Sequence, residues 1–281
     1  MSQKRQDSSL GGREHKRHRD GTGGRHGRGG GGDGYPPAQQ APPVLDLPLP
    51  EGGVHIDGSM LEGGGQILRN ASALAAITHT PIKVDSIRAG RSNPGLRPQH
   101  LTGLQLIAEL SGGALEGGAV GSRCITLRPG PLRCGSHVGD TRTAGSCMLL
   151  AQSALPCLLF AAAATDGGCS STLELRGGTD AAMAPPVGYM EHVLLPTLRA
   201  RLGLSADMVL QRRGFFPRGG GLVCLSVDAL ATGAALPPLL LEERGQVVRL
   251  VTHAFTAGKV PPHVAERMAR AAERGGCPDG R

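Results

Sequence analysis

The chain has 281 residues with a formal net charge of +7, and only 2% of them are aromatic. A chain of this length can bury the core of one large domain or two small ones, and its positive charge is compatible with an anionic partner such as nucleic acid. The longest apolar run, residues 147–164, contains Gln152 and Pro156 and has no flanking anchors, so we expect a buried helix there and no membrane association.

Residues 1–50 consist mostly of glycine, arginine, histidine and proline in low-complexity order. Such a segment cannot bury enough apolar surface to offset its chain entropy, so we predict a disordered extension. Its basic clusters, at residues 4–5 and 16–19, are compatible with a nuclear address or with a loose contact to RNA. We therefore expect a protein of the nucleus (nucleoplasm), with the cytoplasm as the alternative.

From residue 54 onward, the spacing of apolar residues predicts alternating strands and helices. The predicted strands are 54–57, 82–87, 114–116, 124–127, 133–138, 171–175, 208–211 and 222–227, and the predicted helices are 66–77, about 101–108, 144–163 and 187–202. This order indicates two copies of one βαβαββ unit, in the α/β (α+β) class. A linker after residue 229 leads to a further predicted strand at 247–252 and a helix at 262–274.

The segment from Glu62 to Arg69 places one carboxylate and three glycines directly before a predicted helix. Glycines let backbone N–H groups approach a ligand, and a helix N-terminus adds a partial positive charge. Glu62 could hold a divalent cation and Arg69 could grip a phosphate oxygen, which suits a nucleotide or a terminal phosphate. The spacing matches neither a P-loop nor a dinucleotide-binding fingerprint, and a tight turn before a helix would also account for the glycines.

The loop before the second predicted helix carries Arg88, Arg91 and Arg97 among glycines and prolines. A planar guanidinium group pairs bidentately with phosphate, and a stiff backbone lowers the entropy cost of binding. We interpret the loop as a phosphate-binding element, with solvated surface arginines as the alternative. His100, which follows the loop, is expected on a helix face.

Gln152 is the only long polar side chain in the apolar helix predicted at 144–163. A buried amide without a partner costs about 1–3 kcal/mol, so this amide needs a partner. A nucleotide base or phosphate would serve, and an internal backbone group would serve equally well.

Seven cysteines are scattered along the chain, and no two form a C-x-x-C pair. Their number is odd, and most lie in apolar surroundings. Reduced thiols in the core of an intracellular protein are the simplest interpretation.

Together, these motifs resemble the RNA 3'-terminal phosphate cyclase family. The resemblance covers about residues 54–275 and rests on several long motifs in the same order. The matching segments are residues 57–69, 87–100, 143–146, 177–179 and 216–221.

The resemblance implies a fold of repeated βαβαββ units, similar to the C-terminal domain of bacterial translation initiation factor three, with a smaller inserted domain. It implies a catalytic-type domain of two repeats at residues 51–230 and the beginning of a small inserted α/β domain at residues 245–281. In the family, the nucleophilic histidine follows the insert and a further repeat, and neither His253 nor His263 lies in the matching motif. We therefore expect this chain to be C-terminally incomplete and to lack that histidine.

The family's reaction implies ATP, Mg²⁺ (or Mn²⁺) and a substrate RNA that ends in a 3'-phosphate. An enzyme histidine is adenylylated, AMP passes to the RNA 3'-phosphate, and the neighbouring 2'-OH closes a 2',3'-cyclic phosphate as AMP leaves. By resemblance, Glu62 is the metal ligand and is catalytic together with Arg69 and Arg91. The other residues implied are Arg88, Arg91, Arg97 and Gln99 for the RNA phosphate, and Gln152 and Pro185 for ATP.

Two alternatives to a cyclase of the ligase class remain. One is a non-catalytic factor of the same superfamily that binds RNA and acts in ribosomal RNA processing, although the intact segments 62–69 and 88–91 favour the cyclase branch. The other is an RNA-binding module that uses the basic tail, where Tyr35 is the only aromatic residue for stacking. The sequence indicates no oligomeric state.

Overall fold

The order of helices and strands in the first half of the fold recurs in the second. The computed structural model describes residues 46–60, 64–162 and 168–275. The first repeat consists of β1 (Val54–Asp57), α1 (Gly65–Thr78), β2 (Ile82–Asp85), α2 (Pro98–Leu110), β3 (Ala114–Glu116) and β4 (Ile125–Arg128). The second repeat consists of β5 (Ser136–Asp140), α3 (Cys147–Leu159), β6 (Ser170–Gly177), the continuous helical run α4 (Val187–Tyr189), η1 (Met190–Leu194) and α5 (Leu195–Leu202), β7 (Ala206–Arg212) and β8 (Gly221–Asp228). The α/β class with βαβαββ units, expected from the sequence, is confirmed.

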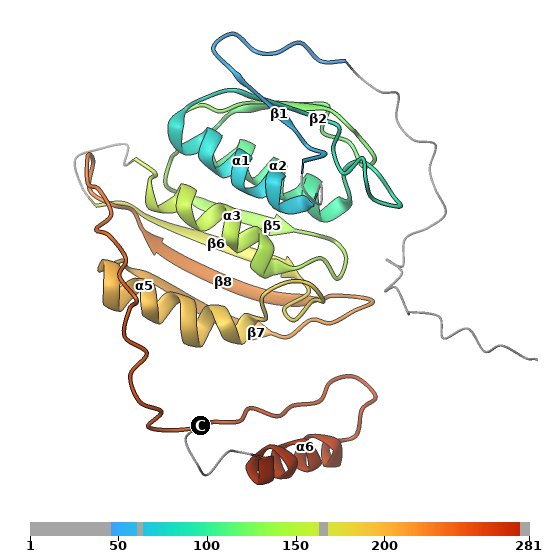
Figure 1. The fold of residues 1–281 in the computed structure, drawn as a ribbon, viewed down its shortest axis with the longest axis vertical. Coiled ribbons are helices and arrows are strands. Elements are labelled where there is room, and N and C mark those ends of the chain that lie inside the picture. The colour runs from blue at the N-terminus through green and yellow to red at the C-terminus, as the bar shows by residue number, and fades with distance from the viewer. Residues whose placement is uncertain (1–45, 61–63, 163–167, 276–281) are drawn as a thin grey trace, which may run out of the picture. The chain divides into compact units, whose positions relative to one another are not determined.

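Each repeat forms one four-stranded sheet, and the two sheets have the same topology (Figure 1). The strand order is β1-β2-β4-β3 in the first sheet and β5-β6-β8-β7 in the second. The first two strands of each repeat are parallel, and the other neighbours are antiparallel. The first strand of each repeat also ends at an aspartate, Asp57 or Asp140, whose carboxylate accepts a hydrogen bond from the backbone N–H two residues later. The two repeats therefore share this turn as well as their strand order.

Helix α3 is apolar over almost its whole surface because neighbouring elements cover most of it. Helices α1 and α2 lie next to each other and both contact α3, which in turn contacts β6 and β8 (Figure 1). Met148, Leu150 and Leu158 are at most 2% exposed. A helix buried in this way needs no wide polar face. Within the described part of the chain, we find no helix long and apolar enough to cross a membrane.

The strand predicted at residues 247–252 is wrong. This segment has no regular secondary structure, and Val248 is 94% exposed. A strand needs a neighbour that satisfies its backbone groups, and none of the strands in the described ranges pairs with this segment. The chain directly after this segment contacts the second repeat through aromatic rings, since His253 stacks on His192. The helix predicted after it forms as α6 (Pro262–Gly275), none of whose residues is buried.

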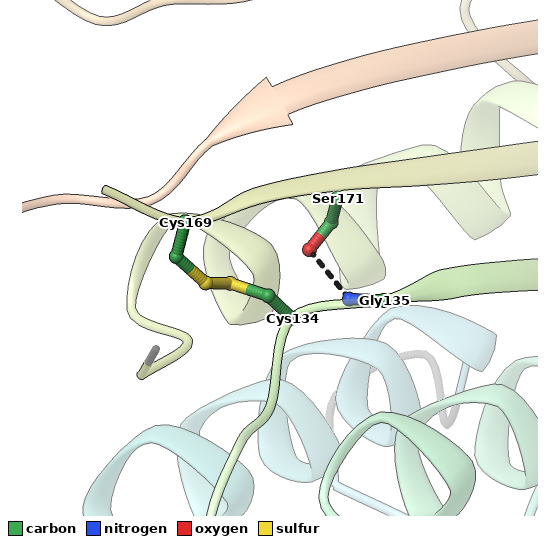
Figure 2. The surroundings of a disulfide bond; sticks show 4 residues. All are labelled: Cys134, Gly135, Cys169 and Ser171. Atoms are coloured by element: carbon green, nitrogen blue, oxygen red, sulfur yellow. Dashed lines mark hydrogen bonds between the residues drawn. A yellow bond between two sulfur atoms is a disulfide. The ribbon is translucent and has the colours of Figure 1, made fainter. Parts of the chain in front are cut away.

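Cys134 and Cys169 form a disulfide (Figure 2), so the expectation of reduced thiols is wrong for these two residues. Cys134 lies just before β5 and Cys169 just before β6, and the parallel pairing of these strands brings the two Cα atoms to 6.1 Å. The two cysteines are 35 residues apart in the sequence and approach each other only because their strands pair in the sheet. The sequence pattern alone therefore did not reveal the pair. Cys147 and Cys157 are free, and burial raises the pKa of each thiol to about 12, so both stay protonated.

Candidate phosphate-binding site

Helices α1, α2 and α3 enclose a narrow cleft near their N-terminal ends. Its volume is about 10 Å³, close to the space that one water molecule needs. Residues from three helices line it: Gly65, Leu68, Arg69, Ser72, Gln99, His100, Gly103, Leu104, Leu149, Leu150 and Ser153. Arg69 and His100 are the ionisable residues of this lining. Because the cleft is too small for a nucleotide, it suits a single group such as one phosphate oxygen at its mouth.

Arg69 points a buried donor into this region. Burial lowers the pKa of its guanidinium group, which nevertheless stays charged at neutral pH. Its Nε is buried and has no hydrogen-bond partner among the described residues. The first turn of α1 contains no acidic residue either. A buried donor without an acceptor costs about 1–3 kcal/mol, and an anionic oxygen would satisfy both this donor and the N-terminus of α1.

His100 packs against the start of α1 as a neutral side chain. Burial, together with the charges of Arg88, Arg69 and Arg97, lowers its pKa to about 4. Its Nδ1 accepts a hydrogen bond from the backbone N–H of Arg97 at 3.2 Å, so the proton of the neutral ring is on Nε2. A Cβ atom on Gly65 would lie 2.3 Å from this Nε2. The glycine in the motif is therefore required by the approach of an imidazole ring.

The role of His100 was missed by the sequence reasoning, which placed this residue on a helix face. The available signal was its position three residues after Arg97, the N-cap of α2. A side chain at that position can reach back to the backbone N–H of the N-cap residue, as in a capping box. Histidine is not one of the residue types usually sought there, so the signal was weak.

The arginine loop is shaped by one of its own arginines. Arg88 has a φ of 54°, and its Nη1 donates hydrogen bonds to the carbonyl oxygens of Asn93, at 2.7 Å, and Gly95, at 3.0 Å. This guanidinium group therefore closes the loop, a role that the prediction of a phosphate ligand did not include. Arg91 is exposed at the turn, and its Nη2 would lie 3.7 Å from a Cβ atom built on Gly64. The loop thus places Arg91 beside the glycine segment that begins α1.

Gln99 joins the two repeats at the site. Its Oε1 accepts a hydrogen bond of 2.9 Å from the backbone N–H of Ser146, the N-cap residue of α3. The Ser146 hydroxyl accepts in turn from the N–H of Leu149. Because the amide oxygen of Gln99 is engaged, its NH₂ group is the part that can donate to a phosphate. The structure therefore brings Gln99, Arg69 and Arg91 to neighbouring helix starts.

Of the predicted site residues that the structure describes, only Arg69 and Gln99 line this cleft. Glu62 lies outside the described residues. Gln152 is exposed on α3, so the expectation that its amide is buried is wrong, and Pro185 is half-buried before α4. Neither lines the Arg69 cleft.

The described residues show no cluster of metal-ligating side chains. They contain no group of three or more histidine, cysteine, aspartate or glutamate side chains that could hold a metal ion. Mg²⁺ prefers oxygen ligands and usually takes only one or two carboxylates from the protein, together with phosphate oxygens of the substrate. A role for Glu62 as that carboxylate therefore stays a prediction.

The sequence of this chain is similar to known proteins over most of its length. A family model described as RNA 3'-terminal phosphate cyclase matches residues 60–269. The chain is 44% identical to the RNA 3'-terminal phosphate cyclase of Desulfurococcus amylolyticus over 221 residues, which are 79% of this chain and 59% of that protein. The proteins of the same name from Pyrobaculum aerophilum and Staphylothermus marinus are 42% and 41% identical, over 78% of this chain and over 60% and 58% of their own lengths. This chain spans about three fifths of these relatives and belongs to the RNA 3'-terminal phosphate cyclase family.

Proposed function

We propose that this protein acts in the ATP-dependent conversion of an RNA 3'-terminal phosphate into a 2',3'-cyclic phosphate. The name shared by its relatives supports this reaction. The observation that carries the proposal is the buried Nε of Arg69, which has no acceptor among the described residues. The Nη1 of the same side chain lies next to Gly65, at a helix start that favours anions.

The proposed reaction has three steps. A histidine nitrogen, which the family resemblance implies lies outside these 281 residues, attacks the α-phosphorus of ATP, and pyrophosphate leaves. The RNA 3'-phosphate then displaces the histidine and joins AMP through a phosphoanhydride. Finally, the RNA 2'-OH attacks the activated 3'-phosphorus, loses its proton and closes the ring, and AMP leaves.

The described residues supply the phosphate-binding part of this reaction. Arg69 and Arg91 hold oxygens of the RNA 3'-phosphate, and the NH₂ group of Gln99 donates to the same group. His100 keeps the start of α1 in place as a neutral side chain. It is not the nucleophile, because its Nδ1 is engaged by a backbone N–H and its Nε2 carries the proton.

The ATP and metal contacts of the proposal rest on the family resemblance. Gln152 and Pro185 contact ATP, and Glu62 holds Mg²⁺ or Mn²⁺. Such a metal ion, when bound, neutralises charge on crowded phosphates. The exposure of Gln152 leaves its amide accessible to a ligand.

The test uses a short RNA whose 3'-terminal phosphate carries ³²P. The purified chain is incubated with this RNA, ATP and Mg²⁺, together with a C-terminal segment of a relative, because the nucleophilic histidine is expected outside these 281 residues. Label that resists phosphatase is measured, because a cyclic phosphate resists it. The proposal predicts resistant label that requires ATP and appears with formation of AMP. Arg69→Met is expected to lower the rate by about a hundredfold or more, as for loss of a preorganised charge contact. Arg201→Met removes an exposed arginine on α5 and is expected to have no effect.

The contrary result is label that stays sensitive to phosphatase while the RNA binds tightly. That outcome would favour the alternative of a non-catalytic RNA-binding factor of the same superfamily. Because binding and turnover are measured on the same preparation, the two functions are distinguishable.

A further inference from the structure

A second group of arginines lies on the second sheet, away from the Arg69 cleft. In the register of that sheet, Asp140 of β5 pairs with Arg176 of β6, Arg176 with Leu222 of β8, and Leu222 with Arg212 of β7. These four residues form one row across all four strands. They line a cavity of about 450 Å³ together with Arg218 and other loop residues.

This cavity lies on the face of the sheet that the helices leave open. Along β6, Leu173 and Leu175 are fully buried, whereas Glu174 and Arg176 alternate with them and are accessible. Because successive side chains of a strand point to opposite faces, Arg176 and Glu174 lie on the side opposite the core. A ligand of the cavity can therefore approach from solvent.

The floor of the cavity is already paired within the protein. Arg176 forms an ion pair with Glu174, and the Nε of Arg212 donates to the carbonyl oxygen of Gly220 at 2.7 Å. The carboxylate of Asp140 accepts the backbone N–H of residue 142 at 2.7 Å. These contacts fix the side chains at the floor of the cavity. A ligand would therefore bind to side chains at the rim of the cavity.

Two arginines at the rim have no such engagement. The side chains of Arg142 and Arg218 have no hydrogen-bond or ion-pair partner among the described residues, and both are exposed. With four arginines against two carboxylates, the lining carries a net charge of +2. The pocket therefore attracts an anion and has two guanidinium groups available to bind it.

The two rim arginines are presented by loops that pack against each other. Arg142 has a φ of 52°, a conformation that costs about 1–3 kcal/mol for a residue other than glycine and that the Asp140 turn maintains. Gly219, beside Arg218, lies so close to Thr143 that a Cβ atom would be 2.2 Å from the Thr143 carbonyl oxygen. The contact brings both arginines to one cavity with a fixed backbone.

A groove connects this pocket with the start of α2. The pocket residues Asp140, Arg142 and Thr143 also line a neighbouring groove of about 600 Å³, whose other wall includes Pro98 and Thr102. These α2 residues flank Gln99 and His100 of the Arg69 cleft. An extended polymer with regularly spaced phosphates fits this arrangement better than a compact ligand does.

We propose that the pocket of Arg142 and Arg218 binds an internal phosphodiester of the RNA strand whose 3'-phosphate is held near Arg69. This inference rests on the proposed function, and it assigns the second repeat to the RNA upstream of the reacting end. The phosphates of ATP are the other source of the same chemistry, and the test separates the two.

The test compares ligands that differ in their internal phosphates. Binding of a 3'-phosphorylated RNA dodecanucleotide, of adenosine 3'-monophosphate and of ATP is measured for the wild-type chain and for Arg142→Gln/Arg218→Gln. The double variant is expected to bind the dodecanucleotide about tenfold or more weakly, as for loss of charge-assisted hydrogen bonds. The slope of log affinity against log salt should fall by about 0.7, the contribution of one neutralised phosphate on a single strand. Adenosine 3'-monophosphate, which has no phosphodiester, and ATP should bind as before.

A control variant and three contrary outcomes complete the test. Arg201→Gln removes one arginine charge from an exposed position of α5 and should change none of the three affinities. Unchanged dodecanucleotide binding by the double variant would overturn the inference while leaving the proposed function in place. Equal weakening for ATP would overturn it in favour of a triphosphate site. A wild-type chain that binds no RNA would overturn the proposed function and this inference together.

Discussion

The side-chain oxygen of Gln99 accepts a hydrogen bond from the backbone N–H of Ser146 at 2.9 Å, and this bond joins the start of α2 in the first repeat to the start of α3 in the second. Ser146 is fully buried, so its N–H has no access to water. The two repeats are thus linked beside the Arg69 cleft, and the residue that links them was predicted from the sequence only as a phosphate contact.

Replacing Gln99 with leucine should destabilise the protein by about 1–3 kcal/mol, because a buried N–H loses its acceptor. Gln99→Glu keeps an acceptor at the same position and should retain most of the stability. Gln105→Leu, an exposed position on the same helix, should stay within about 0.5 kcal/mol of wild type. Urea unfolding of the three variants measures these differences, and equal stability of Gln99→Leu and Gln105→Leu would refute the link.

Gly65→Ala should cost about 1–3 kcal/mol, because the new methyl group would overlap the imidazole of His100 and displace it from its backbone partner. Gly64 is the matched control. A Cβ there meets its nearest atom at 3.7 Å, so Gly64→Ala should cost at most about 1 kcal/mol, the ordinary loss for alanine at an N-cap. Chemical denaturation of both variants decides the matter, and similar losses at the two glycines would show that the His100 contact does not set the requirement.

His100 makes stability depend on pH. Its folded pKa of about 4 is below the unfolded value of 6.5, so the unfolded chain binds more protons between these values. The stabilisation is fully present above pH 6.5 and is lost as pH falls toward 4, by an amount on the order of 3 kcal/mol. Asparagine can keep an acceptor near the Nδ1 position without titrating. The stability difference between wild type and His100→Asn should therefore change across this window, and parallel pH profiles would contradict the assignment.

The disulfide between Cys134 and Cys169 should stabilise the protein by about 3–4 kcal/mol, as expected for a closed loop with a sequence separation of 35 residues. Wild-type protein should melt at a lower temperature after treatment with a reductant. The Cys134→Ser/Cys169→Ser variant should melt at the lower temperature under both conditions. A wild-type melting temperature that is unaffected by reductant, with two further free thiols by mass spectrometry, would mean that the bond does not form.

Local patterns in the sequence were sufficient for most of the fold. The strand at 54–57 and the strand at 114–116 form with the predicted bounds, and the repeated βαβαββ order was visible because each helix and strand has its own apolar period. The strand predicted at 247–252 failed for a complementary reason. Its apolar residues favour an extended backbone, but a strand forms only beside a partner strand. The local sequence does not specify whether such a partner is present.

The site was harder to predict because its geometry depends on contacts between distant residues. The fit of Gly65 to His100 and the bond from Ser146 to Gln99 join residues 35 or more positions apart, and no spacing rule covers them. Gln152 was expected to be buried because its neighbours are apolar, yet the packing of α3 leaves this one position exposed. The residue types and the glycines indicated that the site binds phosphate. The roles of individual side chains could be assigned only from the three-dimensional structure.

The affinity of the chain for RNA with and without a 3'-terminal phosphate is the most direct test of the Arg69 cleft. Binding of a 3'-phosphorylated and a 3'-hydroxyl dodecanucleotide is measured for wild type, Arg69→Met and Arg201→Met. Wild type and Arg201→Met should prefer the phosphorylated RNA by about tenfold or more, the worth of one charge-assisted hydrogen bond. Arg69→Met should lose this preference without losing stability, because a buried guanidinium with an unpaired donor contributes little to folding. Equal binding of the two RNAs by wild type, or a preference that survives in Arg69→Met, would contradict the assignment of this cleft to the terminal phosphate.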